Sequence, residues 1–576
     1  MLVKAAAAPM AEYYMQCQSL PAKVCDQVDK LIRDFLWGST EEKRRLHLVG
    51  WDKVTLPKEL GGLGLHKMKD RNSALLAKLC WRLAYEKEAP WARMITAKYL
   101  SPRRMTEVGK KLPCSSCWAA FKKGGPVYVK GLKWSVRNGE SVKLWDDFWL
   151  PMGVLRSVIE GPLNRNEDLI TVKQCFDQNF EWQGHNLSFV LPDHVINAIK
   201  ATPLSCNQEA EDTLQWAFSK NGFFSLKSAY LLARGLNPLN LESVSFAWVW
   251  RVETLPKVQF FLWLCLHNSV PTGDVLGSRG LSLDPTCCLC NKEFESIDHL
   301  LRGCEYAQNY WQQLHFPHSL RDSFNLPVCE WLEVCCTADI KSKWMGIPWK
   351  VLFPMGVWNL WLHRNNVVFR TGRVDRSCFR KSIKDGAEFF SVGLNARLPR
   401  AKTLISVGWE KPPTGWAKLN SDGAAFGSSG RAGGGGIIRD HDGNWLKGYA
   451  RPLGSTSSCM AEMWALRDGL LLAKEMGLSN LIIELDALSI VLLMNNNTEN
   501  LLMEPLLTDC RNLMQEIPNK QIIHSYREAN QCADALAKFG ANSLDSFVIF
   551  LYPPPVVDIL LAADKACVRC NRIINS

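Results

Sequence analysis

The chain has 576 residues, of which 47% are hydrophobic and 22% are charged, and its formal net charge is +11. This composition excludes an intrinsically disordered chain, and at about 150 residues per domain the length predicts three or four folded domains. The best apolar run, residues 547–563, is broken by three prolines and an aspartate, and the N-terminus lacks a sustained apolar core. We therefore expect no membrane association and no secretion, but an intracellular protein of the nucleus or cytoplasm.

The first quarter of the chain carries the basic excess. Residues 1–150 hold 27 basic and 15 acidic side chains, whereas residues 410–545 hold 12 and 16. Apolar residues at helical spacing predict helices over 22–37 and 73–85. Cations and tryptophans interleave around the second helix, which is typical of a nucleic-acid-binding face. The alternative is that the tryptophans are core residues and the cations a solvated rim that serves solubility.

The middle of the chain is expected to hold two further parts. Residues 121–207 predict a strand-rich connector, because valines and tryptophans are frequent at its start. A new unit begins near residue 208, with alternation from Leu214 to Phe218 and then a helix from Ser225. The stretch 256–267 predicts an apolar helix.

One cysteine and histidine pattern has metal-ligand spacing. Cys287 and Cys290 are followed by His299 and Cys304, which is C-x2-C-x8-H-x4-C. Four such ligands close a tetrahedral site, so the spacing predicts one structural Zn²⁺ ion with no open position for catalysis. Cys288 leaves the register ambiguous, although only Cys287 gives the C-x2-C spacing. Two further Cys-x-x-Cys pairs lack a second pair nearby and are weak as metal sites: Cys114/Cys117 and Cys567/Cys570.

The segment after the zinc pattern is predicted to be helical, with a basic run from Arg364 to Lys384, and Lys411-Pro412-Pro413 marks a boundary. An α/β pattern follows. We expect a strand at 415–421, a glycine-rich hairpin at Gly433 to Gly436, and the remaining elements in this order: strands 437–439 and 445–450, helix 458–476, strand 481–485, helices ending near 494 and 517, strand 521–526 and helix 530–539. The order βββαβααβα predicts a central five-stranded mixed sheet flanked by helices.

Four acidic residues stand where such a sheet would bring them together. Asp422 ends the first strand, Glu462 lies early on the next helix, Asp486 ends the fourth strand, and Asp534 begins the last helix. Hydrolysis of a phosphodiester by two metal ions needs such a set, and ligands that are all oxygens suit Mg²⁺. Any one of these residues alone is equally a solvated cap or turn residue.

The motifs LNSDGA, MAEMWAL, IELDA and REANQCADALA resemble the type-1 ribonuclease H domain of plant LINE-type (non-LTR) retroelements. The resemblance implies a ribonuclease H-like fold and cleavage of the RNA strand of RNA–DNA hybrids with two Mg²⁺ ions. It implies that Asp422 bridges the metals, that Glu462 and Asp486 hold the metal on the leaving-group side, and that Asp534 holds the metal that activates water.

The same resemblance implies three further roles. His524 stands at the spacing of the mobile histidine that assists water handling or product release, although it is equally a residue of the strand IIHSY. Asn530 is expected to orient the substrate, and the backbone amide of Gly423 to approach the RNA.

The resemblance extends upstream. The stretch CCLCNKEFESIDHLLRGCEYAQNYW resembles the zinc-binding domain that follows reverse transcriptase in these elements, and residues 22–91 resemble the C-terminal end of that enzyme. The polymerase palm with its paired aspartates is missing from this sequence, so polymerase activity is not expected. The predicted parts are these: 1–120 reverse-transcriptase remnant, mainly α; 121–207 connector; 208–315 zinc-binding domain, mainly α; 316–409 helical basic linker; 410–541 ribonuclease H domain; 542–576 tail.

Three functions are compatible with this organisation. The first is a ribonuclease H with nucleic-acid-binding appendages that acts on an RNA–DNA hybrid. The second is a catalytically inactive nucleic-acid-binding remnant of a retroelement, and the third is a scaffold in which the zinc site mediates protein interactions. The sequence predicts no particular protein partner.

Overall fold

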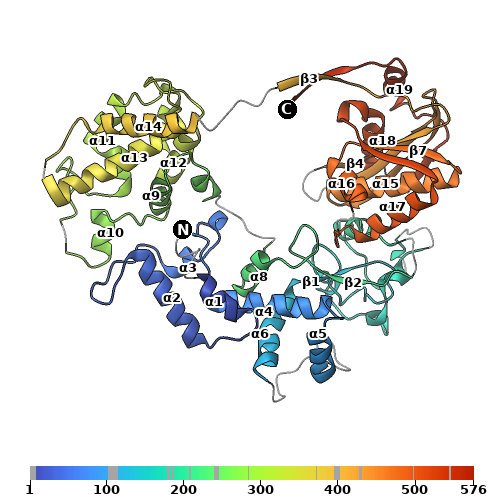
Figure 1. Cartoon of the computed structure of the whole chain (residues 1–576), viewed down its shortest axis with the longest axis horizontal. Coiled ribbons are helices and arrows are strands. Elements are labelled where there is room, and N and C mark those ends of the chain that lie inside the picture. The colour runs from blue at the N-terminus through green and yellow to red at the C-terminus, as the bar shows by residue number, and fades with distance from the viewer. Residues whose placement is uncertain are drawn as a thin grey trace. The chain divides into compact units, whose positions relative to one another are not determined.

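The computed structural model describes residues 8–100, 115–177, 182–184, 187–205, 209–238, 246–282, 284–371, 373–394, 402–426, 431–496, 499–543 and 547–575. The chain forms two compact units (Figure 1). Unit 1 combines residues 1–127 and 230–399, and unit 2 combines residues 128–229 and 400–576. Each unit is therefore built from two separate stretches of sequence. Within the described ranges, no helix is both long and apolar enough to cross a membrane.

Unit 1 is helical in its described residues. Its helices are α1 (Ala8–Met15), α2 (Ala22–Trp37), α3 (Trp51–Val54), α4 (Met68–Tyr85), α5 (Pro90–Ile95), α9 (Pro256–Leu266), α10 (Gly273–Ser278), α11 (Glu305–Gln313), α12 (Val328–Thr337), α13 (Trp349–Asn366) and α14 (Cys378–Leu394). Helices α6 (Ser116–Gly131) and α8 (Leu226–Ala233) contain junctions between the units. Helix α9 begins with a proline, whose fixed φ and missing N–H suit the first helical position.

Aromatic side chains form much of the core of unit 1. Trp311, Trp331, Trp349 and Phe353 are all at most 2% exposed, and the rings of Trp311 and Phe353 stack with their centroids 5.1 Å apart. In the N-terminal quarter Trp81 is buried as well. This tryptophan is therefore a core residue, as the alternative to a base-stacking role proposed.

Unit 2 contains most of the strands. Its elements are β1 (Leu132–Ser135), α7 (Asp193–Lys200), β2 (Thr213–Trp216), β3 (Lys402–Val407), β4 (Ala417–Ala425), β5 (Arg431–Arg439), β6 (Trp445–Ser455), α15 (Ser458–Glu475), β7 (Asn480–Leu485), α16 (Leu488–Asn495), α17 (Glu504–Glu516), β8 (Asn519–His524), α18 (Gln531–Asn542), β9 (Val548–Phe550), α19 (Asp558–Lys565) and β10 (Cys570–Asn575). From β4 to α18 the succession of elements is the one predicted from sequence periodicity.

The central sheet of unit 2 has the strand order β8-β7-β4-β5-β6-β9. Strands β8, β7 and β4 run parallel, whereas β5, β6 and β9 pair antiparallel, so the sheet is mixed. The prediction of five strands was wrong, because β9 adds a sixth. Strand β9 has only three paired residues, and they lie in the segment expected to be a tail. Three residues are too few for a recognisable alternating pattern.

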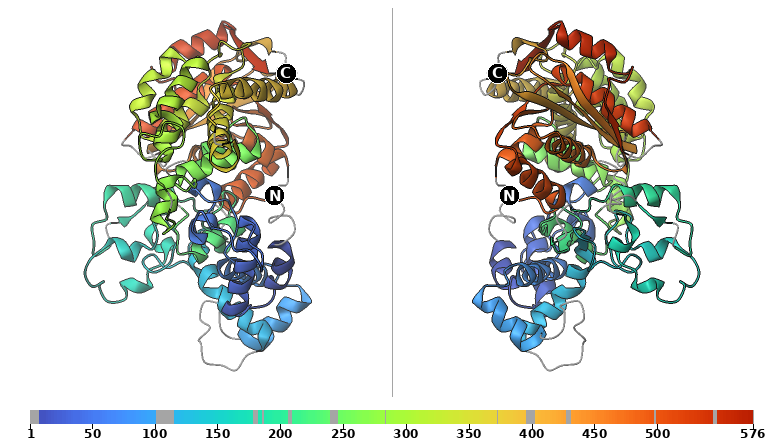
Figure 2. Two further views of the ribbon diagram at one scale, coloured as in Figure 1. Left: turned by 90° about the vertical axis from the view of Figure 1, so that its left-hand side faces the viewer. Right: turned by 90° about the vertical axis from the view of Figure 1, so that its right-hand side faces the viewer.

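The glycine run Gly433 to Gly436 lies inside strand β5 and not in a hairpin turn, which corrects the sequence-based expectation. A Cβ atom on Gly435 would lie 2.4 Å from the backbone nitrogen of Ala537 in α18, and one on Gly434 would lie 3.3 Å from Ala465 in α15. Helices thus press on both faces of this strand (Figure 2). The glycines are needed because the backbones of α18 and β5 are in direct contact.

The connector is less strand-rich than predicted. Its first valines lie in helix α6, and its one described strand, β1, pairs with β2 in a separate two-stranded sheet. Trp145 and Trp149 are buried in a core that has little regular secondary structure. The large apolar side chains that predicted strands in this segment therefore fill a core with little regular secondary structure.

The segment after α18 packs onto the sheet. Val557 and Leu561 contact a cluster that includes Ile437 of β5. Arg439, which is 1% exposed, pairs with Asp564 of α19 at 2.6 Å. Strand β10 then pairs antiparallel with β3.

We predict that Gly435→Ala destabilises unit 2. The new methyl group overlaps the backbone of α18, and such overpacking costs about 1–3 kcal/mol or more. The unfolding temperature of unit 2 should fall by roughly 5 °C or more, as measured by calorimetry on the full chain. Gly277→Ala is the control, because its Cβ would meet open space; equal effects of the two changes would contradict the packing argument.

Candidate functional site

Three of the predicted carboxylates converge at one end of the sheet. Asp422 lies within β4, which continues to Ala425 and so does not end at Asp422 as predicted. Asp486 follows β7 directly, and Glu462 lies near the start of α15. Because β4 and β7 are parallel neighbours in which Asn420 pairs with Glu484, their carboxyl ends fall at the same edge. Ligand oxygens of these three side chains all lie within 4.8 Å of one another.

Gly423 allows α15 to approach β4. A Cβ atom at this position would lie 2.2 Å from the backbone nitrogen of Glu462, so only glycine fits. Its backbone amide also favours the charged forms of Asp422 and Glu462, which partly opposes the effect of burial on their pKa values. The structure thus gives Gly423 a packing role, and its predicted contact with RNA remains a prediction.

Burial and the neighbouring carboxylates disfavour the charged forms of Asp422 and Glu462. Burial, reinforced by the charges of Asp486 and Asp534, raises the pKa of Asp422 to about 7. Burial and the charges of Asp422 and Asp486 also raise the pKa of Glu462 well above its usual value. The Oε2 atom of Glu462 is buried and has no hydrogen-bond partner within the described residues. A buried, unpartnered carboxylate oxygen facing other carboxylates is the donor set that a hard divalent cation satisfies.

Asp534 lies near this group but outside the close set. Its charge raises the pKa of Asp422, yet its own Oδ2 pairs with Nζ of Lys538 at 2.7 Å, one helical turn further along α18. The Asp534 side chain is 44% exposed. The structure therefore brings together three of the four predicted ligands and leaves the fourth at the rim.

Two residues next to Asp486 are His524, which ends β8, and Arg527, which begins the helical turn Arg527–Ala529 after it. Nε of the exposed Arg527 lies 3.2 Å from Oδ2 of Asp486, and Nε2 of His524 lies 3.2 Å from the backbone oxygen of Asp486. The His524 imidazole is exposed at the strand end, beside the carboxylate cluster. Its proposed mobility is untested by this geometry.

A buried polar network supports the site from the sheet, and most of its members were missed in the sequence. The Asn530 side chain donates to the backbone oxygen of Ser421, 3.0 Å away, and accepts from Asn420. Asn420 also donates to Glu484, which pairs with Lys418 at 2.7 Å. Lys418, Asn420 and Asp422 are every second residue of β4 and therefore share one face of the sheet. This period of two is the sequence signal that could have indicated the polar network. Asn530 thus ties the start of α18 to β4 beside Asp422; its predicted contact with substrate remains untested.

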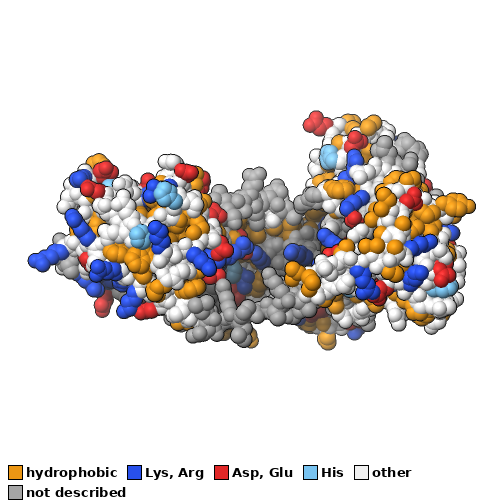
Figure 3. Space-filling view, turned by 90° about the horizontal axis from the view of Figure 1, so that it is seen from above, with side chains coloured by type: hydrophobic (Ala, Val, Ile, Leu, Met, Phe, Trp, Pro, Cys, Tyr) orange, Lys and Arg blue, Asp and Glu red, His pale blue; other side chains and the backbone are white. Residues whose placement is uncertain are grey.

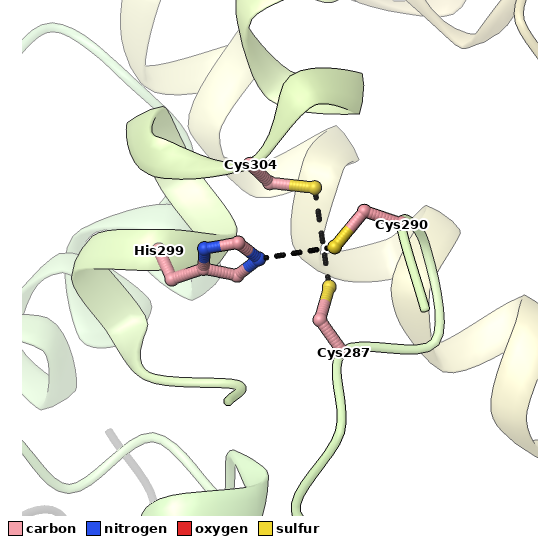
Figure 4. A group of neighbouring side chains, drawn as sticks. All are labelled: Cys287, Cys290, His299 and Cys304. Carbon is pink, nitrogen blue, oxygen red and sulfur yellow. Dashed lines mark hydrogen bonds between the residues drawn. The ribbon is translucent and has the colours of Figure 1, made fainter. Parts of the chain in front are cut away.

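The second candidate site is the cysteine and histidine cluster of unit 1. Cys287, Cys290, His299 and Cys304 point toward a common centre (Figure 4), and their ligand atoms lie within 4.8 Å of one another. The sulfurs of Cys287 and Cys304 are 3.9 Å apart, and the sulfur of Cys290 is 3.4 Å from Nε2 of His299. A tetrahedral zinc ion would require about 3.8 Å and 3.6 Å for these pairs.

The surroundings of the cluster favour a thiolate at Cys287, whereas the hydrogen bond to that thiolate raises the pKa of Cys304, so this pair shares one proton when no cation is bound. Hydrogen bonding from Cys304, aided by the amides of Leu289 and Cys290, lowers the pKa of Cys287 to about 5. The adjacent Cys288 is not in the cluster, and burial raises its pKa to about 11. This settles the register in favour of Cys287. Oε2 of Glu293 lies 3.0 Å from Nδ1 of His299, which orients the ring so that Nε2 faces the other ligands.

The other Cys-x-x-Cys pairs do not form such a cluster in the described part of the chain. Cys567 and Cys570 are exposed free thiols. Cys114 lies outside the described residues, so the pair Cys114/Cys117 is not placed.

The fold and the two clusters match two families of retroelement proteins. Residues 420–540 match the family described as reverse transcriptase-like, and residues 224–311 match the one described as zinc-binding in reverse transcriptase. The first match covers the carboxylate cluster, and the second covers the Cys/His cluster. They show a retroelement-derived protein.

Two Arabidopsis proteins and one solved structure are among the similar proteins. An Arabidopsis thaliana protein named "Putative ribonuclease H protein At1g65750" is 30% identical over 574 residues, which is 98% of this chain and 92% of that protein. The chain therefore belongs to the family of this Arabidopsis protein. The "Uncharacterized mitochondrial protein AtMg00310" of the same plant is 30% identical over 24% of this chain and 90% of its own length. The crystal structure of RNase H1 from Halobacterium salinarum is 24% identical, with a TM-score of 0.21, over 22% of this chain and 96% of that one.

We predict that the stability of unit 2 without divalent metal falls as the pH rises. Asp422 ionises near 3.8 when unfolded and near 7 when folded, so the folded state binds the extra proton between these values and its advantage is lost as the pH rises through 7. Asp422→Asn removes this loss, which is on the order of 2–4 kcal/mol. It should therefore raise the unfolding temperature at pH 8 far more than at pH 5. Thermal unfolding of the full chain at both pH values measures this, and an equal effect at both would contradict it.

We predict that the purified chain carries about one zinc ion and that Cys290→Ser loses it, because a tetrahedral site needs all four ligands. Elemental analysis after gel filtration gives the metal content. Cys288→Ser is the matched control and should retain the ion. Loss of zinc from the control, or its retention in Cys290→Ser, would show that the ligands are misassigned.

Proposed function

We propose that this protein is a hydrolase that cleaves the RNA strand of RNA–DNA hybrids with divalent metal ions. The observation that carries the proposal is the buried group Asp422, Glu462 and Asp486, with an unpartnered oxygen on Glu462. The group lies in the segment that matches the reverse transcriptase-like family, in a chain whose Arabidopsis relative is named a ribonuclease H protein.

Mg²⁺ fits the carboxylate group, because every ligand offered is an oxygen. Asp422, between the other two, would be shared by two ions, Glu462 and Asp486 would hold the one on the leaving-group side, and Asp534 would complete the second position. When bound, such ions favour hydroxide formation from water and neutralise charge on the phosphate that is cleaved. Two positive ions also remove the repulsion that raises the pKa of Asp422 and Glu462.

The remaining residues have supporting roles in this proposal. Asp534 would be able to act as a ligand by turning toward the other three carboxylates, and the Lys538 ammonium would then be available to contact the hybrid backbone. The exposed Arg527 guanidinium is placed to bind a phosphate oxygen. His524 assists with water or with product release, and Asn530 fixes the position of α18 relative to β4.

We also propose that the Cys/His cluster holds one structural Zn²⁺ ion. Its four ligands leave no open position, so it contributes to the folding of unit 1 and not to hydrolysis. In this proposal the reverse-transcriptase remnant, the zinc-binding segment and the basic linker supply nucleic-acid affinity, whereas the acidic ribonuclease H domain supplies the chemistry.

One observation favours a second candidate function. Lys538 and Arg527 already pair with Asp534 and Asp486. If these pairs persist, the chain would bind a hybrid without cleaving it, as expected of an inactive retroelement remnant.

We predict Mg²⁺-dependent cleavage of the RNA strand of a labelled RNA–DNA hybrid by the full chain, followed on a denaturing gel. Asp422→Asn should lower the rate by at least 100-fold, because it removes the charge shared between the metals.

Asp442→Asn, an exposed change in the turn between β5 and β6, is the matched control and should leave the rate unchanged. Hybrid binding without cleavage by the unmodified chain would favour the second candidate. Cleavage that survives Asp422→Asn would reject the assigned site.

A further inference from the structure

A basic cavity in unit 1 lies next to the zinc cluster and takes no part in the carboxylate site. Its volume is about 810 Å³, and it lies between α11, the helical turn His318–Asn325 and the segment 341–343. This volume is within the range of about 300–1,000 Å³ that is common for sites of small ligands.

The cavity is lined by basic groups and by no acidic residue. Four permanent cations and two imidazoles line it: Arg302, Arg321, Lys341, Lys343, His315 and His318. Arg321, Lys341 and Lys343 are exposed, and within the described part of the chain none of the three forms an ion pair. On the face drawn in Figure 3, Lys and Arg side chains of the lobe of α9 to α14 are interspersed with Asp and Glu side chains. Arg302, the fourth cation, already pairs with Asp298, whereas the other three are uncompensated and together favour an anionic ligand.

Aromatic rings form the apolar part of the same cavity. Trp311 is buried beneath it, and Phe316 and Phe324 are half-buried with ring centroids 4.8 Å apart. Cations beside aromatic faces are the combination by which proteins hold single-stranded nucleic acid, in which phosphates meet the cations and unpaired bases stack on the rings. An acidic peptide would use the cations but leave the rings without a planar partner.

The zinc cluster holds one wall of the cavity in place. Arg302 belongs to the turn His299–Gly303, which lies between two of the zinc ligands. Its guanidinium lies 5.5 Å from the ring centre of Trp331, and its Nη1 donates to the backbone oxygen of Phe324, 2.9 Å away. The ligand set therefore fixes the position of a cavity residue.

We propose that this cavity binds a segment of single-stranded nucleic acid, with its phosphates on Arg321, Lys341 and Lys343 and a base against the aromatic rings. The site is separate from the carboxylate group, so it stands whether or not the chain cleaves hybrids. The zinc-binding segment, which contributes Arg302 and Trp311, and the segment that follows it would together hold a single strand of nucleic acid.

The test measures binding of fluorescent single strands of about 12 nucleotides, one of DNA and one of RNA, to the zinc-loaded full chain without added Mg²⁺. Lys341→Glu/Lys343→Glu should weaken binding by at least 10-fold and reduce the slope of log affinity against log salt by about 1–2. Lys200→Glu/Lys220→Glu, which changes the net charge equally at two exposed lysines of unit 2, is the matched control and should change affinity less than 2-fold. Zinc content and circular dichroism confirm that both variants fold, and Arg321→Glu provides a second variant of the cavity.

Several outcomes would overturn the proposal. One is equal weakening by the cavity and control variants, which would show a diffuse charge effect. Another is affinity unchanged in both Lys341→Glu/Lys343→Glu and Arg321→Glu. Competition by uridine monophosphate or by poly-glutamate as effective as that by the oligonucleotide would reassign the cavity to a free nucleotide or an acidic peptide. A difference between the DNA and RNA strands would identify which strand the cavity prefers and supports the proposal.

Discussion

Unit 2 is organised around the repulsion among three closely packed carboxylates, two of them buried. Ligand oxygens of Asp422, Glu462 and Asp486 lie within 4.8 Å of one another, and at an effective dielectric constant of 20 two unit charges about 4–5 Å apart repel by about 3–4 kcal/mol. The parallel register of β4 and β7 fixes two of them, and the close contact of α15 with Gly423 fixes the third. The side chains cannot separate to relieve the repulsion, so protons or cations must do so. This makes the metal-free site sensitive to pH.

The zinc cluster of unit 1 presents the opposite situation. There the backbone amides of Leu289 and Cys290 favour the charged form of Cys287, and Glu293 sets the orientation of His299. The Cys287 thiolate and the His299 ring are thus prepared for a cation, whereas burial works against ionisation of Asp422. A site whose ligands are already charged suits a permanent structural ion. A site in which burial disfavours ionisation of the ligands suits ions that arrive together with an anionic substrate.

Much of this could be predicted from the sequence, because the signals are local. The hydrophobic periodicity located the helices α2 and α9 and the elements from β4 to α18, and four short motifs located the carboxylates. The failures concern contacts between distant segments. Nothing local shows that Gly435 faces a helix, that three residues of the tail form β9, or that Lys538 holds Asp534. The buried pair of Lys418 and Glu484 was also invisible, since each looks like a surface residue until the sheet is assembled.

The pairing of Arg439 with Asp564 sets the C-terminal limit of the smallest fragment that can fold as unit 2 does. The family match ends at residue 540, but a protein cut there would retain a buried guanidinium without its carboxylate, and would lose β9 from the sheet edge. Leaving one partner of a buried ion pair alone costs about 3–5 kcal/mol, a large part of the stability of an ordinary domain. Strands β3 and β10 also join the two ends of this stretch. The cooperative folding unit therefore includes residues 402–575 together with residues 128–229 of unit 2, whose Leu204 and Ser205 bond to the buried Arg467 and Asp509. It extends well beyond the motifs by which its family is recognised.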